Sequence, residues 1–210
     1  FGVAFDGDAD RAVFIDDAGK VVSGSMMTTL IADYLSEKNN NLKVVYNVNV
    51  SPHALSILES KNVSLFRCKV GHSNIKAMMK ELEADFGGEH SAHFYYKDNY
   101  FADSAILTLL MLMSIVSERE EKVSSMIDKY NFPPSSGEIN FVVDDVDNSL
   151  EKIKTVFDGN FDELDGLSYF DENFWFNVRG SNTETKLRVN IEATSQKILD
   201  EVLEKISTTI

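Results

Sequence analysis

Three aspartates alternate with small residues near the start of the chain, in residues 6–11 (DGDADR). Alternate carboxylates on a tight turn can direct three hard oxygen ligands at one point. Mg²⁺ suits such a site because it completes its coordination shell with water and substrate phosphate. The segment therefore predicts a magnesium site formed by Asp6, Asp8 and Asp10, with Arg11 beside it to pair with a phosphate group. For this segment alone, a solvated acidic turn is an equal alternative.

A second polar cluster follows two glycines, in residues 87–93 (GGEHSAH). The glycines let a ligand approach the backbone. Glu89 and Ser91 can hydrogen-bond to sugar hydroxyl groups, and His93 titrates near neutral pH, so it can act as a general acid or base. A polar turn with structural histidines is the alternative, although two of the four histidines of the chain lie here beside a carboxylate.

A third segment, residues 179–188 (RGSNTETKLR), gathers three cations in a chain whose net charge is −14. Small polar residues with free backbone N–H groups can form a nest for phosphate oxygens, and an arginine adds a bidentate fork. The expected phosphate ligands are Arg179, Ser181, Asn182, Thr183 and Arg188. An exposed hairpin with incidental charges is the alternative, and Arg188 lies on an expected strand, where it can instead be structural.

A weaker signal is Gly71 followed by His72 at the start of an expected helix, an arrangement that can face an anion. The plain alternative is a helix capped by Ser73.

The order of the expected elements indicates the fold class. Apolar runs and helical spacing predict an alternation of strands (1–5, 13–15, 21–22, 43–48, 63–67) and helices (26–36, 52–60, 73–83, 103–118, 122–130). This pattern favours an α/β domain with a mixed or largely parallel sheet. After the Pro- and Ser-rich residues 131–137, a smaller α+β domain with an antiparallel sheet is expected. Its elements are strands at 139–143, 166–170, 174–178 and 186–193 and helices at 149–157 and 196–206.

Composition narrows the class of protein. The acidic surface argues against nucleic acid and membrane partners, because both present phosphate groups that require a basic face. The longest apolar stretch, residues 105–113, is far shorter than the roughly 20 residues of a membrane span. The lone Cys68 fits a reducing compartment, so a cytoplasmic protein is expected. The chain opens on an apolar strand at Phe1, from which we expect a preceding N-terminal portion.

Taken in chain order, these segments resemble the α-D-phosphohexomutase superfamily, the phosphoglucomutases and phosphomannomutases. Residues 6–11 are similar to its magnesium loop, residues 88–93 to its sugar-specificity loop and residues 179–184 to its phosphate-binding loop. Gly71 and His72 are similar to a further substrate-facing loop. The resemblance covers essentially the whole chain.

The resemblance implies a division of the chain, because members of this superfamily have four domains around one cleft. Residues 1–20 would be the tail of the second domain with the metal loop, residues 21–132 the sugar-binding third domain, and residues 133–210 the phosphate-binding fourth domain. The first domain carries a phosphoserine, and no segment of the type Thr-Ala-Ser-His-Asn-Pro occurs in the chain. The fragment is therefore expected to be inactive alone.

The implied reaction interconverts hexose 1-phosphate and hexose 6-phosphate through the phosphoserine and a hexose 1,6-bisphosphate, with glucose or mannose as the sugar. By the resemblance, Mg²⁺ is the cofactor, Arg11, His72 and His93 assist catalysis, and Glu89 and Ser91 bind sugar hydroxyls. Two departures from the family pattern affect the expected substrate preference. Asn49 stands where relatives carry a substrate-facing lysine, and Ala92 replaces a glycine.

Two other classes of function stay open at the level of sequence. A divalent-cation binding or interaction module without catalysis would explain the aspartate loop and the acidic surface, but not the basic residues 179–188. A structural domain whose motifs are relics would explain the changes at Asn49 and Ala92.

Overall fold

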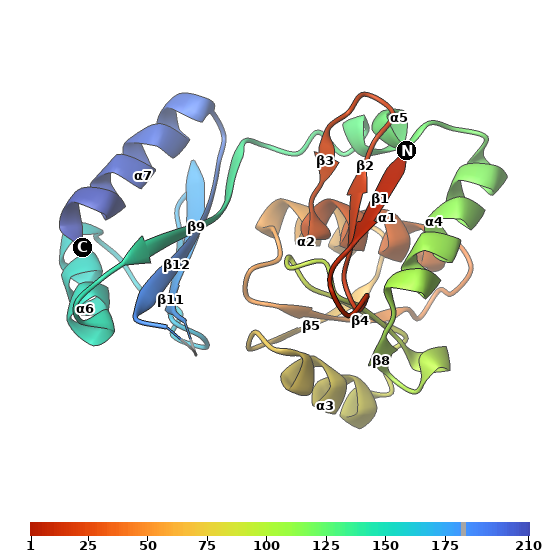
Figure 1. Ribbon diagram of the computed structural model, residues 1–210, viewed down its shortest axis with the longest axis horizontal. Coiled ribbons are helices and arrows are strands. Elements are labelled where there is room, and N and C mark those ends of the chain that lie inside the picture. Colours follow the sequence, from red (N-terminus) through yellow and green to blue (C-terminus); the bar gives the residue numbers. More distant parts are fainter. Residues whose placement is uncertain (182–183) are drawn as a thin grey trace. The chain divides into compact units, whose positions relative to one another are not determined.

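The computed structural model describes residues 1–181 and 184–210, and the chain divides into two compact units, Phe1–Phe132 and Pro133–Ile210 (Figure 1). The division falls within the Pro-containing segment at 131–137. Among the described residues, none of the helices has both the length and the apolar character needed to cross a membrane.

The first unit contains two sheets. The smaller one is antiparallel, with the order β1-β2-β3, and consists of β1 (Gly2–Phe5), β2 (Ala12–Ile15) and β3 (Val21–Val22). The larger one has the order β5-β4-β6-β7-β8 and consists of β4 (Lys43–Asn47), β5 (Ser64–Cys68), β6 (Phe86–Gly88), β7 (Phe94–Tyr96) and β8 (Ala102–Asp103). β4 is parallel to β5 and β6, whereas β7 is antiparallel to β6 and β8. The predicted mixed sheet is confirmed.

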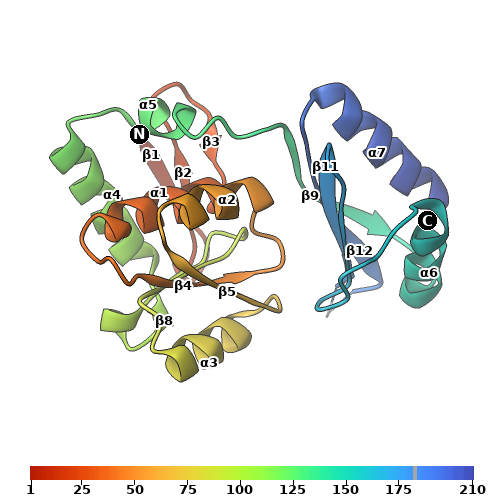
Figure 2. The same cartoon turned by 180° about the vertical axis from the view of Figure 1, so that it is seen from behind.

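Helices separate and cover these sheets. They are α1 (Gly24–Ser36), α2 (Pro52–Ser60), α3 (His72–Leu82), α4 (Ala105–Arg119), α5 (Val123–Asp128) and the short 3₁₀ helix η1 (Lys97–Asn99). Figures 1 and 2 show α1 and α2 between the two sheets and α3 on the far side of the larger sheet. Neighbouring residues of β4 pack on opposite faces of the larger sheet, because strand side chains alternate between faces. Val44 packs in the core that includes α1, and Val45 packs with Ile75 and Met79 of α3.

Several elements of the first unit differ from the expectation. β6, β7 and β8 were not predicted, because strands of two or three residues are too short to show an alternating pattern. The helix expected at 103–118 begins at Ala105, since the Ser104 side chain caps it by accepting from the Leu107 N–H. Asp103 therefore lies on β8. The proposed cap at Ser73 is wrong, because α3 begins one residue earlier and Gly71, with φ of 120°, occupies the cap position.

The second unit is an antiparallel sheet with two helices on one face (Figures 1 and 2). The strand order is β10-β11-β12-β9. Its elements are β9 (Ser135–Val142), α6 (Val146–Val156), β10 (Leu167–Phe170), β11 (Phe174–Gly180), β12 (Lys186–Ala193) and α7 (Gln196–Thr209). Phe176 and Val178 of β11 lie in the core with the helices, so the alternate residues Asn177 and Arg179 point to the other face. The expected α+β class is confirmed.

Candidate active site

The loop between β1 and β2 brings the three predicted metal ligands together. One carboxylate oxygen from each of Asp6, Asp8 and Asp10 lies within 4.8 Å of the others. A tight turn produces this convergence, because the Ala9 N–H donates to the Asp6 carbonyl oxygen at 3.3 Å and Ala9 has φ of 59°. Three converging carboxylates are oxygen ligands of the kind that Mg²⁺ takes, so these residues fit the ion.

Arg11 closes the same loop by binding Asp6. Its Nε and Nη2 atoms each lie 2.7 Å from Asp6 Oδ2, and its backbone N–H donates to Asp6 Oδ1 at 3.2 Å. Partial burial would raise the pKa of Asp6, but these hydrogen bonds and the guanidinium charge outweigh it and lower the pKa to about 2. The Asp6 carboxylate is therefore ionised over the whole physiological pH range, and the Arg11 side chain, 48% exposed, stays accessible to an anion.

A tight turn between β6 and β7 forms the predicted sugar loop. The Glu89 N–H donates to the His93 carbonyl oxygen at 3.0 Å, and the Ala92 N–H donates to the Glu89 carbonyl oxygen at 3.1 Å. Ala92 has φ of 68°, the left-handed region in which glycine is at no disadvantage. The loop packs directly on the start of α1, where a Cβ at Gly24 would lie only 2.3 Å from the Glu89 carbonyl oxygen.

The Glu89 side chain is the buried centre of this loop, with 2% of the residue exposed. Its Oε1 accepts from the Gly71 N–H at 3.3 Å, and its Oε2 accepts from Ser91 Oγ at 3.1 Å and from the Tyr95 hydroxyl at 3.4 Å. His93 Nδ1 lies 3.2 Å from the same Oε2. Burial opposes ionisation, but His93, Gly71 and Ser91 together lower the pKa of Glu89 below its ordinary value. Glu89 therefore orders the loop and fixes His93.

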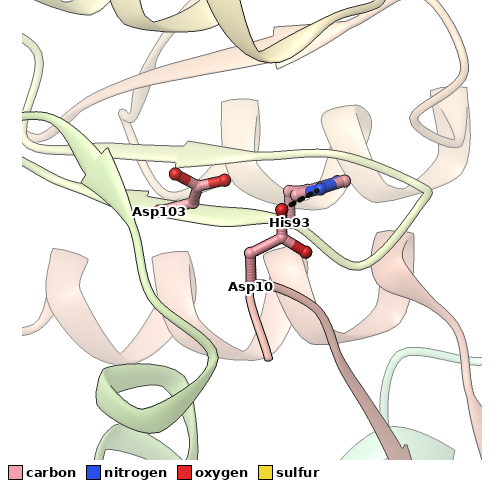
Figure 3. Close-up of side chains that lie close together, drawn as sticks. All are labelled: Asp10, His93 and Asp103. Atoms are coloured by element: carbon pink, nitrogen blue, oxygen red, sulfur yellow. Dashed lines mark ion pairs between the residues drawn. The ribbon is translucent and has the colours of Figure 1, made fainter. Parts of the chain in front are cut away.

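His93 joins the predicted sugar loop to the predicted metal loop. Its Nε2 lies 3.4 Å from Asp10 Oδ2, as Figure 3 shows, and the Ala12 N–H donates to the Ala92 carbonyl oxygen at 3.4 Å. Two segments that are about 80 residues apart in the sequence thus meet at one point.

The surroundings of His93 favour its charged form. Burial would lower the pKa of this imidazole, but the carboxylates of Glu89, Asp10 and Asp103 outweigh that effect and raise it. The side chain is 18% exposed, so it is accessible to a ligand while it stays fixed by its neighbours.

Three further residues complete the cluster, and sequence reasoning missed all three. Asp103 lies opposite Tyr95 in the register of β7 and β8, which places both side chains on one face beside His93. Lys76 of α3 holds Asp103, with Nζ 2.7 Å from Oδ1, and lies 5.7 Å from the centre of the Tyr95 ring. Burial, and then the charges of Glu89 and Asp103, raise the pKa of Tyr95, so its hydroxyl stays protonated. No motif marks these residues, because strand pairing brings Tyr95 and Asp103 together and the packing of α3 adds Lys76.

The remaining residues predicted in the first unit occupy less central positions. His72 is exposed and is the first residue of α3. The residue before it, Gly71, contacts the cluster, because its N–H donates to Glu89. Asn49 is buried, and in the described part of the chain its Oδ1 atom has no hydrogen-bond partner.

In the second unit, the predicted phosphate ligands include two arginines on neighbouring strands. Arg179 and Arg188 pair across β11 and β12, and both contact Glu138 of β9. The Ser181 N–H, just after β11, donates to the Lys186 carbonyl oxygen at 2.8 Å. Two other predicted ligands, Asn182 and Thr183, lie outside the described residues.

Comparisons with known proteins show which family the chain resembles. Residues 23–131 match the family described as phosphoglucomutase/phosphomannomutase, alpha/beta/alpha domain III, and residues 138–209 match the phosphoglucomutase/phosphomannomutase C-terminal domain. A phosphomannomutase of Methanocaldococcus jannaschii is 39% identical over 210 residues, which is 100% of this chain and 47% of that protein. The chain thus spans about half the length of the curated relatives that it matches.

Solved structures show the same likeness. A phosphoglucomutase/phosphomannomutase family protein from Burkholderia thailandensis superimposes with a TM-score of 0.86 at 26% identity, over 99% of this chain and 45% of that one. An Aspergillus fumigatus N-acetylphosphoglucosamine mutase in complex with GlcNAc-6P and magnesium shares the fold, with a TM-score of 0.75 at 16% identity over 99% of this chain and 48% of that one. The chain belongs to the phosphoglucomutase/phosphomannomutase family and corresponds to its C-terminal portion.

Proposed function

We propose that the chain supplies the metal-binding, sugar-binding and phosphate-binding parts of an enzyme that interconverts hexose 1-phosphate and hexose 6-phosphate. The observation that carries the proposal is the meeting of the metal loop and the sugar loop at Asp10 and His93. A phosphoryl acceptor and a phosphoryl-neutralising cation must lie next to each other in such a reaction. Membership of the mutase family supports the same reading.

The aspartate loop would hold Mg²⁺ through Asp6, Asp8 and Asp10. The bound ion would supply positive charge to the phosphoryl group during transfer. Arg11 is anchored on Asp6 and would bind an oxygen of the same phosphoryl group with its exposed guanidinium.

The sugar loop would position the hexose and move a proton. His93 lies at the edge of the cluster and, as an imidazolium, would give its Nε2 proton to a sugar oxygen or take one back from it. Glu89 would hold the ring of His93 in place, and Ser91, which is exposed, would hydrogen-bond to a hydroxyl group of the sugar. His72 would contribute near the same ligand from the start of α3.

The phosphate group that is not transferred would bind to the second unit. Arg179 and Arg188 place two guanidinium groups on neighbouring strands of that face, where both contact the carboxylate of Glu138. In a chain with a net charge of −14, local positive charge is what a phosphosugar requires. Ser181, Asn182 and Thr183 would add hydrogen bonds.

The first test is calorimetric titration of the chain with glucose 1-phosphate and mannose 1-phosphate, with and without Mg²⁺. We expect binding that weakens by about tenfold in Arg179→Ala, because the loss of a charge-assisted contact to phosphate costs about 1.4 kcal/mol or more. Lys154→Ala is the matched control, because this cation of the same unit pairs with Glu151 and Glu163 away from the arginines. Equal affinity in wild type and Arg179→Ala would contradict the role of the loop, and Mg²⁺ uptake without phosphosugar binding would favour a cation module.

A second test addresses catalysis. The family mechanism implied by the motifs uses a phosphoserine, and the 210 residues contain no such segment. We therefore expect no conversion of glucose 1-phosphate to glucose 6-phosphate by the isolated chain in a coupled assay with Mg²⁺ and glucose 1,6-bisphosphate. Turnover above the background would overturn this part of the proposal.

A further inference from the structure

A second group of possible metal ligands lies next to the aspartate loop. One ligand atom from each of Asp10, His93 and Asp103 lies within 4.8 Å of the others. Figure 3 shows the three side chains close together, with the Asp10 carboxylate beside the imidazole. The three residues come from the β1–β2 loop, the residue before β7, and β8, so the tertiary fold alone assembles them.

The imidazole is held in the way that metal-binding histidines usually are. His93 Nδ1 lies 3.2 Å from Glu89 Oε2 and 3.1 Å from Ser91 Oγ, while Nε2 faces Asp10 at 3.4 Å. A carboxylate on one ring nitrogen fixes the tautomer and the orientation of the ring, and a metal ion that binds the other nitrogen displaces its proton. Glu89 is buried, so this support is rigid.

The surroundings of the two carboxylates, Asp10 and Asp103, also suit a bound cation. Asp10 Oδ1 is shielded from solvent and, among the described residues, has no hydrogen-bond partner, since the nearest guanidinium nitrogen, Arg11 Nε, lies 3.7 Å away. A metal ion bound to this oxygen would add a short contact to its 3.7 Å ion pair with Arg11. The Asp103 side chain is 11% exposed and is fixed by Lys76 on its Oδ1 atom.

The donor set points to a different class of ion from Mg²⁺. One imidazole nitrogen with two carboxylate oxygens is typical of Zn²⁺ and related transition metals, whereas Mg²⁺ prefers oxygen ligands and water. We propose that Asp10, His93 and Asp103 form a transition-metal site that binds Zn²⁺ and excludes Mg²⁺ from the aspartate loop. The two ions compete because both sites need Asp10.

Two substitutions separate the sites. Asp103→Asn removes a ligand of the Zn²⁺ site and leaves Asp6, Asp8 and Asp10 intact, whereas Asp8→Asn removes a ligand of the Mg²⁺ loop alone. We would measure the affinity of each protein for Zn²⁺ by competition with a colorimetric chelator, and for Mg²⁺ by calorimetry. We expect Asp103→Asn to weaken Zn²⁺ binding by at least about tenfold while Mg²⁺ binding changes less than about twofold, and Asp8→Asn to show the opposite pattern.

Further measurements make the result decisive. His93→Gln should weaken Zn²⁺ binding as Asp103→Asn does, and His72→Gln, which removes an exposed histidine outside the cluster, should not. Zn²⁺ should lower the apparent Mg²⁺ affinity of the wild type, and Asp103→Asn should reduce this competition. If Zn²⁺ binding is lost in Asp8→Asn but kept in Asp103→Asn and His93→Gln, Zn²⁺ occupies the aspartate loop and the proposal is wrong. Failure of the wild type to bind Zn²⁺ would also overturn it. The competition with Mg²⁺ rests on the proposed function of the aspartate loop, whereas the Zn²⁺ titrations of wild type, Asp103→Asn and His93→Gln test the new site without it.

Discussion

Arg179 and Arg188 lie opposite each other on β11 and β12, and the carboxylate of Glu138 on β9 contacts both guanidinium groups. Glu138 Oε2 lies 3.4 Å from Arg179 Nη2, and Oε1 lies 3.0 Å from Arg188 Nη1. Like charges directly opposite each other in a sheet repel, so the carboxylate stabilises an arrangement that would otherwise be unfavourable. The same carboxylate must weaken the attraction of this face for an anion.

The first prediction concerns Glu138. Glu138→Gln should lower the free energy of unfolding by about 1 kcal/mol, because the two arginines lose their shared counter-charge. It should also raise the affinity for inorganic phosphate severalfold, because one opposing negative charge is removed. Urea unfolding and calorimetric titration with phosphate measure the two effects. Glu163→Gln is the control, since Glu163 pairs with Lys154 and lies outside the arginine cluster. Weaker phosphate binding in Glu138→Gln would contradict the inference that the Glu138 carboxylate opposes anion binding by Arg179 and Arg188.

The second prediction concerns the backbone of the sugar loop. Ala92 has φ of 68°, which costs a non-glycine residue about 1 kcal/mol, whereas glycine gains freedom in the unfolded chain worth a similar amount. Ala92→Gly should therefore leave the stability unchanged or raise it by up to about 1 kcal/mol. The matched substitution Ala84→Gly, at a buried alanine without positive φ, should lower it by about 1–2 kcal/mol. Equal losses in urea unfolding would show that the loop conformation carries no strain.

The third prediction concerns a buried carboxylate away from the site. Asp33 accepts from the Tyr130 hydroxyl at 2.7 Å, and Lys61 and Arg119 lie at 2.9 and 3.3 Å. Burial would raise the pKa of Asp33, but these partners outweigh it and lower the pKa below its ordinary value of 3.8. The carboxylate thus contributes stability above that value, and this contribution is lost as the pH falls through the lower pKa of the folded state.

Asp33→Asn should therefore cost about 2 kcal/mol at neutral pH, less than for a fully buried pair because Lys61 is half exposed. The difference from wild type should shrink as the pH falls below about 4. Tyr130→Phe removes one hydrogen bond and should cost about 1 kcal/mol. Unfolding measured by circular dichroism from pH 7 to pH 3 tests both values. A difference that does not change with pH would show that Asp33 contributes by shape and not by charge.

The fourth prediction concerns the contact between α1 and the sugar loop. A Cβ at Gly24 would lie 2.3 Å from the Glu89 carbonyl oxygen and 2.4 Å from that of His90, so the loop must move. Gly24→Ala should lower stability by about 1–3 kcal/mol, although alanine alone favours a helix. It should also weaken phosphosugar binding. Gly2→Ala, where the nearest atom lies at 3.9 Å, is the control and should be close to neutral. If Gly24→Ala unfolds at the same urea concentration as wild type and binds the phosphosugar equally well, the sugar loop moves aside without cost and the prediction is wrong.

Much of the fold was predictable because its signals are local. The α/β class and the parallel strands of the first unit, and the antiparallel sheet of the second, follow from alternating apolar runs and helical spacing. The short strands β7 and β8 were missed, since two or three residues carry no periodicity. Asp103, expected at the start of a helix, lies instead on the strand that pairs with Tyr95.

The sequence by itself determined which groups carry chemistry: the aspartates of residues 6–11, the polar loop at 88–93 and the basic segment at 179–188. These are properties of side chains close together along the chain, so spacing alone reveals them. The tertiary structure decided what lies beside them. It placed Lys76 and Asp103 next to His93, and Glu138 between two arginines. Those neighbours depend on strand register and on the packing of layers, which are set by contacts between residues far apart in the sequence.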